Sequence, residues 1–206
     1  MSASNIVLTV VLMALAYLLG SVPFSYLVAR ANGVDLQQVG SGNVGGANVW
    51  RSCGFGPFIV AATCDILKGM LPTLAALHLA GLPPGAVMLV GVAAILGHTF
   101  SLFLKFKGGK AVATSTGVLL AVFPLLIPFG VIAWLVAFLI TRMSSVGSLM
   151  APLVELLLGS ALYIAGQLPL AYAIFIWGIG AFIVYLHRSN IQRLLAGTEN
   201  LFSKIF

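Results

Sequence analysis

Charged residues are scarce in this sequence of 206 residues. They account for 7% of the chain, whereas hydrophobic residues account for 61%; a soluble domain carries about 25% charged residues. Because so few charges cannot cover the polar surface of a soluble domain of this length, most of the surface must face lipid. The composition therefore predicts an all-α, polytopic integral membrane protein. The net charge of +6 suits anionic lipid surfaces, and we expect membrane lipids, not nucleic acid, as partners.

Carboxylates are the scarcest charged groups. The chain has four of them: Asp35, Asp65, Glu155 and Glu199. They form neither the pair that general acid–base catalysis uses nor a cluster suited to a metal ion. We therefore expect no metal and no cofactor. Any reaction must depend on the positioning of substrates and on cations that stabilise negative charge.

Motifs for metal binding and for nucleophilic catalysis are also lacking. The three histidines, His78, His98 and His187, have no ligand spacing, and Cys53 and Cys64 fit no zinc or redox motif. No GxSxG elbow or Cys/His nucleophile signature occurs. Both cysteines are expected to be small buried hydrophobic side chains.

Linkers, low-complexity tracts and repeats are absent, so we expect a single transmembrane domain over residues 1–206. The N-terminal apolar run lacks the positively charged start of a signal peptide. It continues to about Val28, which is long enough to span a membrane. We therefore expect an uncleaved first helix.

Apolar runs of near-spanning length are what the sequence has in abundance. They lie at about 5–28, 57–80, 86–104, 145–165 and 169–186. A further run from Ala111 to Ile140 is interrupted by Pro124 and Pro128. At about 1.5 Å per residue it would form a helix of roughly 45 Å, which is too long for one upright span and short for two.

Lysine and arginine mark the connections that face the cytoplasm. Nine of the ten would share one face if the run 111–140 crosses the membrane twice: Arg30, Arg51, Lys105, Lys107, Lys110, Arg142, Arg188, Arg193 and Lys204. We therefore expect a hairpin of two short helices in 111–140 and about seven transmembrane helices. The N-terminus would lie outside and the C-terminus in the cytoplasm. A single tilted span that leaves Arg142 outside is the alternative.

The tenth basic residue, Lys68, lies inside an apolar run three residues after Asp65. A charge at a helix centre costs about 2.5–3.5 kcal/mol on insertion scales, so such charges normally pair and face the protein interior. The i, i+3 spacing places both side chains on one helix face. Lys68 is thus either half of a structural ion pair or, being near the cytoplasmic end, part of a phosphate-binding site.

The stretch GSGNVGGANVWR at 40–51 is rich in glycine and amides and ends in a cation. Glycines let a ligand approach main-chain N–H groups, which can form an anion-binding nest. Neutral donors and a guanidinium fork would complete a phosphate site. Its predicted members are Ser41, Gly42, Asn43, Asn48 and Arg51. The alternative is a flexible connection.

The stretch GHTFSLFLKFKGGKAVATS at 97–115 places Lys107, Gly108, Gly109 and Lys110 just before a new helix. Glycines and lysines at a helix N-terminus make a ready anion site. The spacing is not that of a P-loop, and the absence of a nearby acidic residue for magnesium argues against an NTPase.

Two further polar stretches follow. In TRMSSVGS at 141–148, Ser144 and Ser145 either cap the next helix or contribute to the phosphate site. In LHRSNIQRLLAGTEN at 186–200, His187 and Asn190 lie at the cytoplasmic end of the last span. His187 is either a structural hydrogen-bonding residue or part of the chemistry. Ile191, Leu194 and Leu195 predict a helix on the membrane surface, and Glu199 is expected to pair with Arg188 or Arg193.

Five of these stretches occur in a familiar order: GSxPFSYLVA, GSGNVGGANVWR, CDILKG, GHTFSLFLKFKGGKAVAT and HRxNIxRLLxGTE. Together they resemble the PlsY-type acyl-phosphate:glycerol-3-phosphate acyltransferases over nearly the whole chain. The resemblance implies transfer of a fatty acyl group from an acyl phosphate to the 1-hydroxyl of glycerol 3-phosphate. The products would be lysophosphatidic acid and inorganic phosphate, as the first step of phospholipid biosynthesis. Acyl-CoA is not the expected donor.

The resemblance also implies roles for individual residues. Ser41 and Arg51 would be catalytic, Gly108, Gly109 and Lys110 would hold glycerol 3-phosphate or phosphate, and His187 and Asn190 would be an essential polar pair. Either His187 or the donor phosphate would accept the proton of the attacking hydroxyl. The sequence departs from the family at Ala47, where threonine is common, and at Ala111, where glycine is expected.

A bacterial cytoplasmic (inner) membrane location, with the active site facing the cytoplasm, follows from the same resemblance, as does a functional link to an enzyme that produces acyl phosphate. The polar stretches are expected to converge at the inner leaflet. The rival interpretations are an anion transporter and, more remotely, a non-catalytic scaffold. Transporters tend to bind their substrate near the midplane between repeated halves, whereas here the polar groups gather toward one face.

Overall fold

Helices make up all the regular secondary structure within residues 2–202, the part of the chain that the structure, a computed structural model, describes. The predicted all-α class is thus confirmed for these residues. Lys204, which the charge argument places in the cytoplasm, lies outside them.

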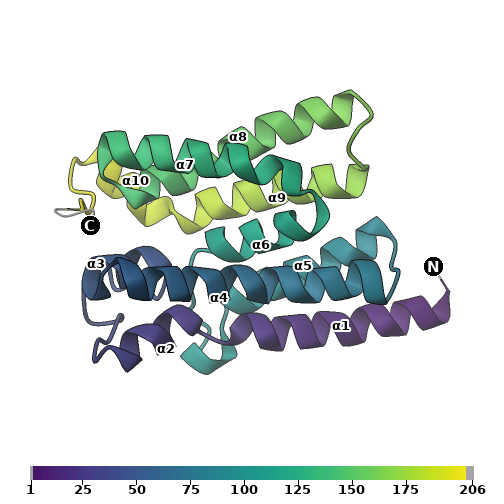
Figure 1. The fold of residues 1–206 in the computed structure, drawn as a ribbon, viewed down its shortest axis with the longest axis horizontal. Coiled ribbons are helices and arrows are strands. Elements are labelled where there is room, and N and C mark those ends of the chain that lie inside the picture. Colours follow the sequence, from purple (N-terminus) through teal and green to yellow (C-terminus); the bar gives the residue numbers. More distant parts are fainter. Residues whose placement is uncertain (1, 203–206) are drawn as a thin grey trace. The chain divides into compact units, whose positions relative to one another are not determined.

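The described chain separates into two compact units, one ending at Val122 and the other beginning at Phe123. In Figure 1 the first runs from purple to teal and the second from green to yellow. Each unit is described by itself, and the expectation of a single domain stays a prediction.

The N-terminal unit is built around one long helix, α4, which contacts most of the other helices of the unit (Figure 1). α1 packs along α5, α6 packs along α4, and the short α2 and α3 also lie against α4. The elements are α1 (Ala3–Ser21), α2 (Phe24–Ala31), α3 (Gly46–Cys53), α4 (Phe55–Leu74), η1 (Ala75–Leu79), α5 (Pro84–Thr99), η2 (Leu102–Leu104) and α6 (Val112–Val122).

The first apolar run, expected as one helix over 5–28, is broken at Val22 and Pro23. The residue before a proline is driven out of the helical region, and Val22 is extended with ψ of 117°. α1 and α2 still form one candidate span, Ala3–Ala31. The break leaves main-chain carbonyl groups without helical partners, and side chains from α4 and from the segment after α5 reach them.

Glycines allow the helices of this unit to approach closely. A Cβ added at Gly20 or Gly97 would overlap the backbone of the other helix in the α1–α5 pair. A Cβ added at Gly69 or Gly117 would overlap the other helix in the α4–α6 pair. Small residues at such contacts are typical of helices packed in membranes, where backbone approach takes the place of a hydrophobic driving force.

The C-terminal unit comprises η3 (Pro124–Leu126), α7 (Ile127–Thr141), α8 (Ser144–Ile164), α9 (Leu170–Leu186) and α10 (Arg188–Leu195). α8 packs against both α7 and α9. α10 is a separate helix bent by 57° from α9, which confirms the predicted helix after Arg188; its place on the membrane surface stays a prediction.

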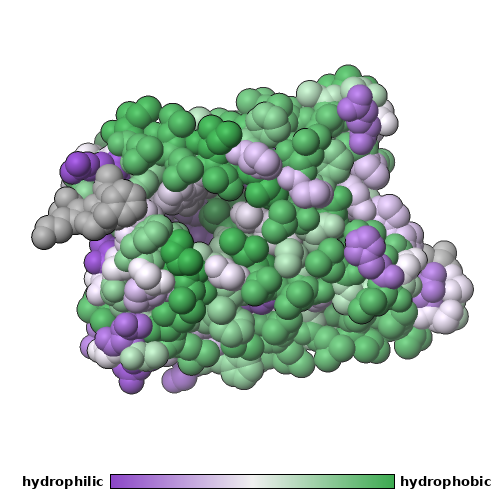
Figure 2. Space-filling model, viewed as in Figure 1, coloured by the Kyte–Doolittle hydropathy of each residue, from purple (hydrophilic) through white to green (hydrophobic). Residues whose placement is uncertain are grey.

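Large apolar side chains are exposed along the outer faces of the helices. Val7 and Val10 on α1 and Ile132 and Ile140 on α7 are all at least half exposed. Figure 2 shows hydrophobic residues over most of the visible face. Exposed apolar area on this scale has a physical explanation only if lipid covers it.

Five helices within residues 2–202 are long and apolar enough to span a membrane, or six if α9 and α10 count as one bent span. Multi-pass membrane insertion is therefore clear. The segment 111–140 is indeed two helices, α6 and α7, but only α6 is short, because Pro124–Thr141 qualifies as a span of 18 residues. The count of seven and the orientation stay predictions.

Candidate active site

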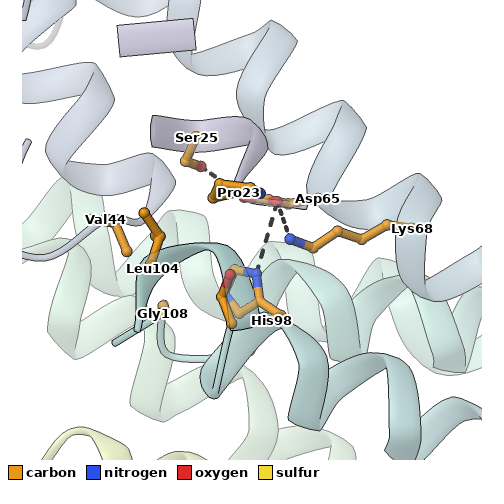
Figure 3. A pocket seen from close by; sticks show the side chains of 10 residues that line it. Pro23, Ser25, Val44, Asp65, Lys68, His98, Leu104 and Gly108 are labelled. Atoms are coloured by element: carbon orange, nitrogen blue, oxygen red, sulfur yellow. Dashed lines mark hydrogen bonds and ion pairs between the residues drawn. The ribbon is translucent and has the colours of Figure 1, made fainter. Parts of the chain in front are cut away.

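A buried group of charged and polar side chains lies where α2, α4 and α5 meet (Figure 3). The Asp65 carboxylate accepts a hydrogen bond of 2.6 Å from the Ser25 hydroxyl and forms an ion pair of 2.8 Å with the Lys68 ammonium. His98 Nδ1 lies 3.7 Å from the same carboxylate. All four residues are at most 7% exposed.

Lys68 also donates a hydrogen bond of 2.8 Å to the Val22 carbonyl at the break between α1 and α2. Its ammonium lies 5.7 Å from the centre of the Phe24 ring. The expected pairing of Asp65 with Lys68 is therefore confirmed. In this structure a carboxylate and a carbonyl already hold the ammonium. Phosphate binding by Lys68 stays a prediction.

The Gly108–Gly109 turn closes over this group of side chains. Gly108 N–H donates to the Thr99 carbonyl at 2.9 Å and Gly109 N–H to the His98 carbonyl at 3.1 Å. A Cβ at Gly109 would overlap the His98 ring, and one at Gly108 would overlap the His98 carbonyl oxygen. The paired glycines thus have a packing role, and the anion-approach role inferred from the sequence stays a prediction.

A small pocket lies at this junction. Its walls come from α2, α4, the end of α5 and the glycine turn, and its lining residues are Pro23, Ser25, Val44, Asp65, Lys68, His98, Ser101, Leu104, Gly108 and Gly109. Ser101 hydrogen-bonds the Ser21 carbonyl at 2.5 Å, so the chain after α5 is anchored to the same break as Lys68.

Left-handed backbone shapes the segment that carries the predicted lysines. Lys105, Phe106 and Ala111 have φ of 52°, 62° and 66°. Lys107 is exposed and Lys110 half-buried, directly before α6. At Ala111 the family's glycine has a physical explanation, because a Cβ is strained in this conformation.

Asn48 organises the glycine-rich loop 40–51. Its amide group donates to the carbonyl groups of Leu36, Val39 and Asn43 at 3.0–3.1 Å and accepts from Ser41 N–H at 3.2 Å. The side chain is 1% exposed. Asn48 therefore shapes the loop from within, and its predicted contact with substrate phosphate is untested.

The other predicted residues of this loop lie nearer its surface. Ser41 and Gly42 are exposed and Asn43 is half-buried. Gly42, with φ of 68°, takes a conformation that disfavours a side chain. Arg51 lies in the last turn of α3, the helix that begins at Gly46.

The C-terminal unit gathers a second polar group around Glu199. One carboxylate oxygen accepts hydrogen bonds from Ser145 at 3.1 Å and Asn190 at 2.8 Å, and the other pairs with Arg193 at 2.9 Å. The expected pairing of Glu199 with Arg193 is confirmed. Ser144 is buried in the first turn of α8, and its predicted role in the phosphate site stays a prediction.

His187 is buried at the junction of α9 and α10. Its Nδ1 lies 2.8 Å from the Ile183 carbonyl. A carbonyl oxygen can only accept, so Nδ1 carries a proton and donates it to this hydrogen bond. Within residues 2–202, no three His, Cys, Asp or Glu side chains lie close enough to hold a metal ion.

Comparison with known proteins assigns a family to this arrangement of glycine loops, lysines and buried polar groups. The sequence model of the family described as glycerol-3-phosphate acyltransferase matches residues 10–197. The chain belongs to the glycerol-3-phosphate acyltransferase family. The resemblance inferred from the five motifs is therefore confirmed, and with it acyl transfer to glycerol 3-phosphate as the family activity.

Individual relatives align over almost their full length. The glycerol-3-phosphate acyltransferase of Roseiflexus sp. (strain RS-1) is 59% identical over 96% of this chain and 97% of the relative. That of Aquifex aeolicus (strain VF5) is 42% identical over 93% and 97%. A crystal structure of PlsY (YgiH), an integral membrane glycerol 3-phosphate acyltransferase, in its glycerol 3-phosphate form, has 41% identity and a TM-score of 0.87 over 95% of this chain and 96% of that chain.

In this member of the glycerol-3-phosphate acyltransferase family, sequence reasoning missed three polar residues that line the pocket: Ser25, His98 and Ser101. A signal was present, because Ser25 lies in PFSYLVA and the other two in GHTFS, both among the five motifs. Their roles went unnoticed because their common partners, Asp65 and the α1–α2 break, are distant in sequence.

Proposed function

We propose that this protein transfers a fatty acyl group from an acyl phosphate to the 1-hydroxyl of glycerol 3-phosphate. The hydroxyl oxygen attacks the acyl carbonyl carbon, the bond from that carbon to the phosphate oxygen breaks, and 1-acylglycerol 3-phosphate and inorganic phosphate leave. An acyl phosphate is a mixed anhydride and is already activated. This reaction can therefore proceed in a chain that has no catalytic carboxylate pair.

The observation that carries the proposal is the Lys107–Lys110 segment. Two cations flank a glycine turn that is fixed to the end of α5 and leads directly into the N-terminus of α6. Main-chain N–H groups and the positive end of the helix dipole favour an anion at such a position. We assign phosphate binding to Lys107, Lys110 and the two glycines.

In the loop 40–51 we assign Ser41 and Arg51 to the reacting phosphates, with Gly42 and Asn43 offering main-chain and amide donors. The Asn48 hydrogen bonds hold the loop in one conformation, so these donors need little reorganisation when a phosphate arrives. Asn48 therefore contributes by shaping the site.

In the C-terminal unit we assign to His187 and Asn190 the binding of the 1-hydroxyl of glycerol 3-phosphate. The lone pair on His187 Nε2 suits a group that orients or deprotonates a hydroxyl. Asn190 donates its amide N–H to Glu199, which directs its carbonyl oxygen, an acceptor, the opposite way. Ser145 is oriented by the same carboxylate, and Ser144 stays a predicted phosphate contact. The donor's own phosphate is the alternative proton acceptor.

For the membrane arrangement we propose seven crossings: the five spans, α9, from which α10 bends away, and the shorter apolar α6. The N-terminus would lie outside and the C-terminus in the cytoplasm of a bacterial inner membrane, with the basic loops on the cytoplasmic face. Soluble glycerol 3-phosphate would then reach the loops from the cytoplasm, and an acyl-phosphate-producing enzyme would supply the donor.

The test is inorganic phosphate release by the purified protein in detergent micelles, with acyl phosphate and glycerol 3-phosphate together. We expect equal amounts of phosphate and 1-acylglycerol 3-phosphate, and none with acyl-CoA as donor. An anion transporter would show no turnover in micelles, where no compartments exist. Turnover with acyl-CoA alone would contradict the donor assignment while leaving the family intact.

A further inference from the structure

The buried charges in the N-terminal unit are more elaborate than a stabilising pair requires. Asp65, Lys68, His98 and Ser25 come from three helices, and Lys68 also holds the α1–α2 break. Burying an ion pair costs desolvation energy that its attraction often only balances, so apolar side chains of similar size would stabilise the bundle as well or better. Ionisable groups at such depth more often serve function.

The outer edge of this cluster touches the glycine turn. In Figure 3 the His98 ring lies between Asp65 on one side and the Gly108 segment on the other. Its Nδ1 faces the carboxylate at 3.7 Å, and its Nε2 occupies the space that a Cβ of Gly109 would need. One imidazole ring thus connects the buried charge to the backbone of the turn.

Two backbone hydrogen bonds also hold the turn to the end of α5. Gly108 N–H donates to the Thr99 carbonyl and Gly109 N–H to the His98 carbonyl. Because Lys110 follows immediately, a shift of the His98 ring would move Gly109 and with it the Cα atom of Lys110. Displacements of about 1 Å in a positioned group can cost up to about a hundredfold in rate.

We infer that Asp65, Lys68 and His98 form a positioning device that fixes the Gly108–Gly109 turn, and so determines where Lys110 presents its ammonium to the phosphate of glycerol 3-phosphate. This inference rests on the proposed function, in which Lys110 binds that phosphate. Asp65 and His98 are positioning residues here and do not touch substrate. Asp65 orients the His98 ring, Lys68 balances the negative charge of Asp65, and the ring supports the turn.

The first test is His98→Phe, which keeps a flat ring against Gly109 but removes the nitrogen that faces Asp65. We expect the KM for glycerol 3-phosphate to rise about tenfold, with the KM for acyl phosphate unchanged within twofold. The matched control is His78→Phe in η1, where the histidine is exposed; both KM values should stay as in the parent protein.

A purely structural role would lower Tm and the active fraction but leave the KM of the folded molecules unchanged. That result, or an equal rise of both KM values, would overturn the inference. A parent protein without acyl-phosphate turnover would instead contradict the proposed function, so the two failures are distinguishable.

A second variant guards against misfolding of the first. Asp65→Asn combined with Lys68→Met removes both charges at once, so that neither is left buried alone. We expect Tm to be retained while the KM for glycerol 3-phosphate rises about tenfold, because the ring has lost its orienting carboxylate. An unchanged KM in this double variant would show that the charges do not position the turn.

Discussion

At the scale of single residues, the hydrogen bond from His187 Nδ1 to Ile183 carries the most chemical consequence. It places a proton on Nδ1, so that in the neutral ring Nε2 is the nitrogen able to accept a proton. Sequence alone left His187 as either a structural or a chemical residue, and a buried ring with one oriented nitrogen is compatible with both.

Replacement of His187 by alanine separates the two proton acceptors. If His187 orients or deprotonates the hydroxyl, turnover of acyl phosphate should fall by about 10²- to 10⁴-fold while Tm changes little. A rate near that of the parent protein would remove His187 from the mechanism and leave the donor phosphate as the base.

Ala111 is a second residue whose conformation makes a prediction. Its φ of 66° is costly for a residue with a Cβ, by about 1–2 kcal/mol, whereas deleting one buried methyl group costs about 0.8 kcal/mol. Ala111→Gly should therefore raise Tm slightly, with activity retained. The control is Ala113→Gly, which lies within α6 and should lower stability by about 1 kcal/mol. Equal losses of Tm in the two variants would show that position 111 is not strained.

At the scale of elements, Glu199 joins three parts of the C-terminal unit. Its carboxylate binds the first turn of α8 through Ser145 and α10 through Asn190 and Arg193. Nearby, Phe202 N–H bonds the Arg142 carbonyl and the Phe202 ring packs edge-on against Phe138. The short segment after α10 therefore fixes how α10 meets the α7–α8 connection.

Glu199→Ala should destabilise this unit by about 3 kcal/mol, because it leaves buried donors unpaired and removes the partner of Arg193. Glu199→Gln should cost less, since an amide oxygen can still accept from Ser145 or Asn190. Thermal denaturation monitored by tryptophan fluorescence would rank the two. If Gln were as destabilising as Ala, the charge on Glu199 rather than its hydrogen bonds would dominate.

At the scale of the whole molecule, the distribution of basic residues leads to a prediction of sidedness. In a background without Cys53 and Cys64, single cysteines at Asn43, Lys107, His78 or Gln167 would be labelled in inside-out and right-side-out vesicles. We expect positions 43 and 107 to react from the cytoplasmic side and positions 78 and 167 from the outer side, because the connections at 80–85 and 166–169 carry no basic residue. Position 107 is preferred to 109 because a side chain at 109 would meet His98.

Labelling of positions 43 and 107 from opposite sides would exclude a common phosphate-binding face. Labelling of position 167 from the cytoplasm would show instead that 111–140 crosses only once, as in the alternative with a single tilted span.

The sequence by itself determined that lipid surrounds most of this protein, that its fold is helical, and which family it belongs to. Low charge and long apolar runs leave lipid as the main surroundings, and contacts within one helix follow from residue spacing, as for Asp65 and Lys68. Ordered motifs carried the family resemblance.

Only the tertiary structure decided how groups on different helices meet. The break at Pro23 exposes carbonyl groups, but nothing in the local sequence says that Lys68 and Ser101 reach them. Likewise, Asn48 fills its own loop and His98 stands between Asp65 and Gly109. Such contacts depend on the packing of whole helices against one another, and no local spacing in the chain encodes that packing.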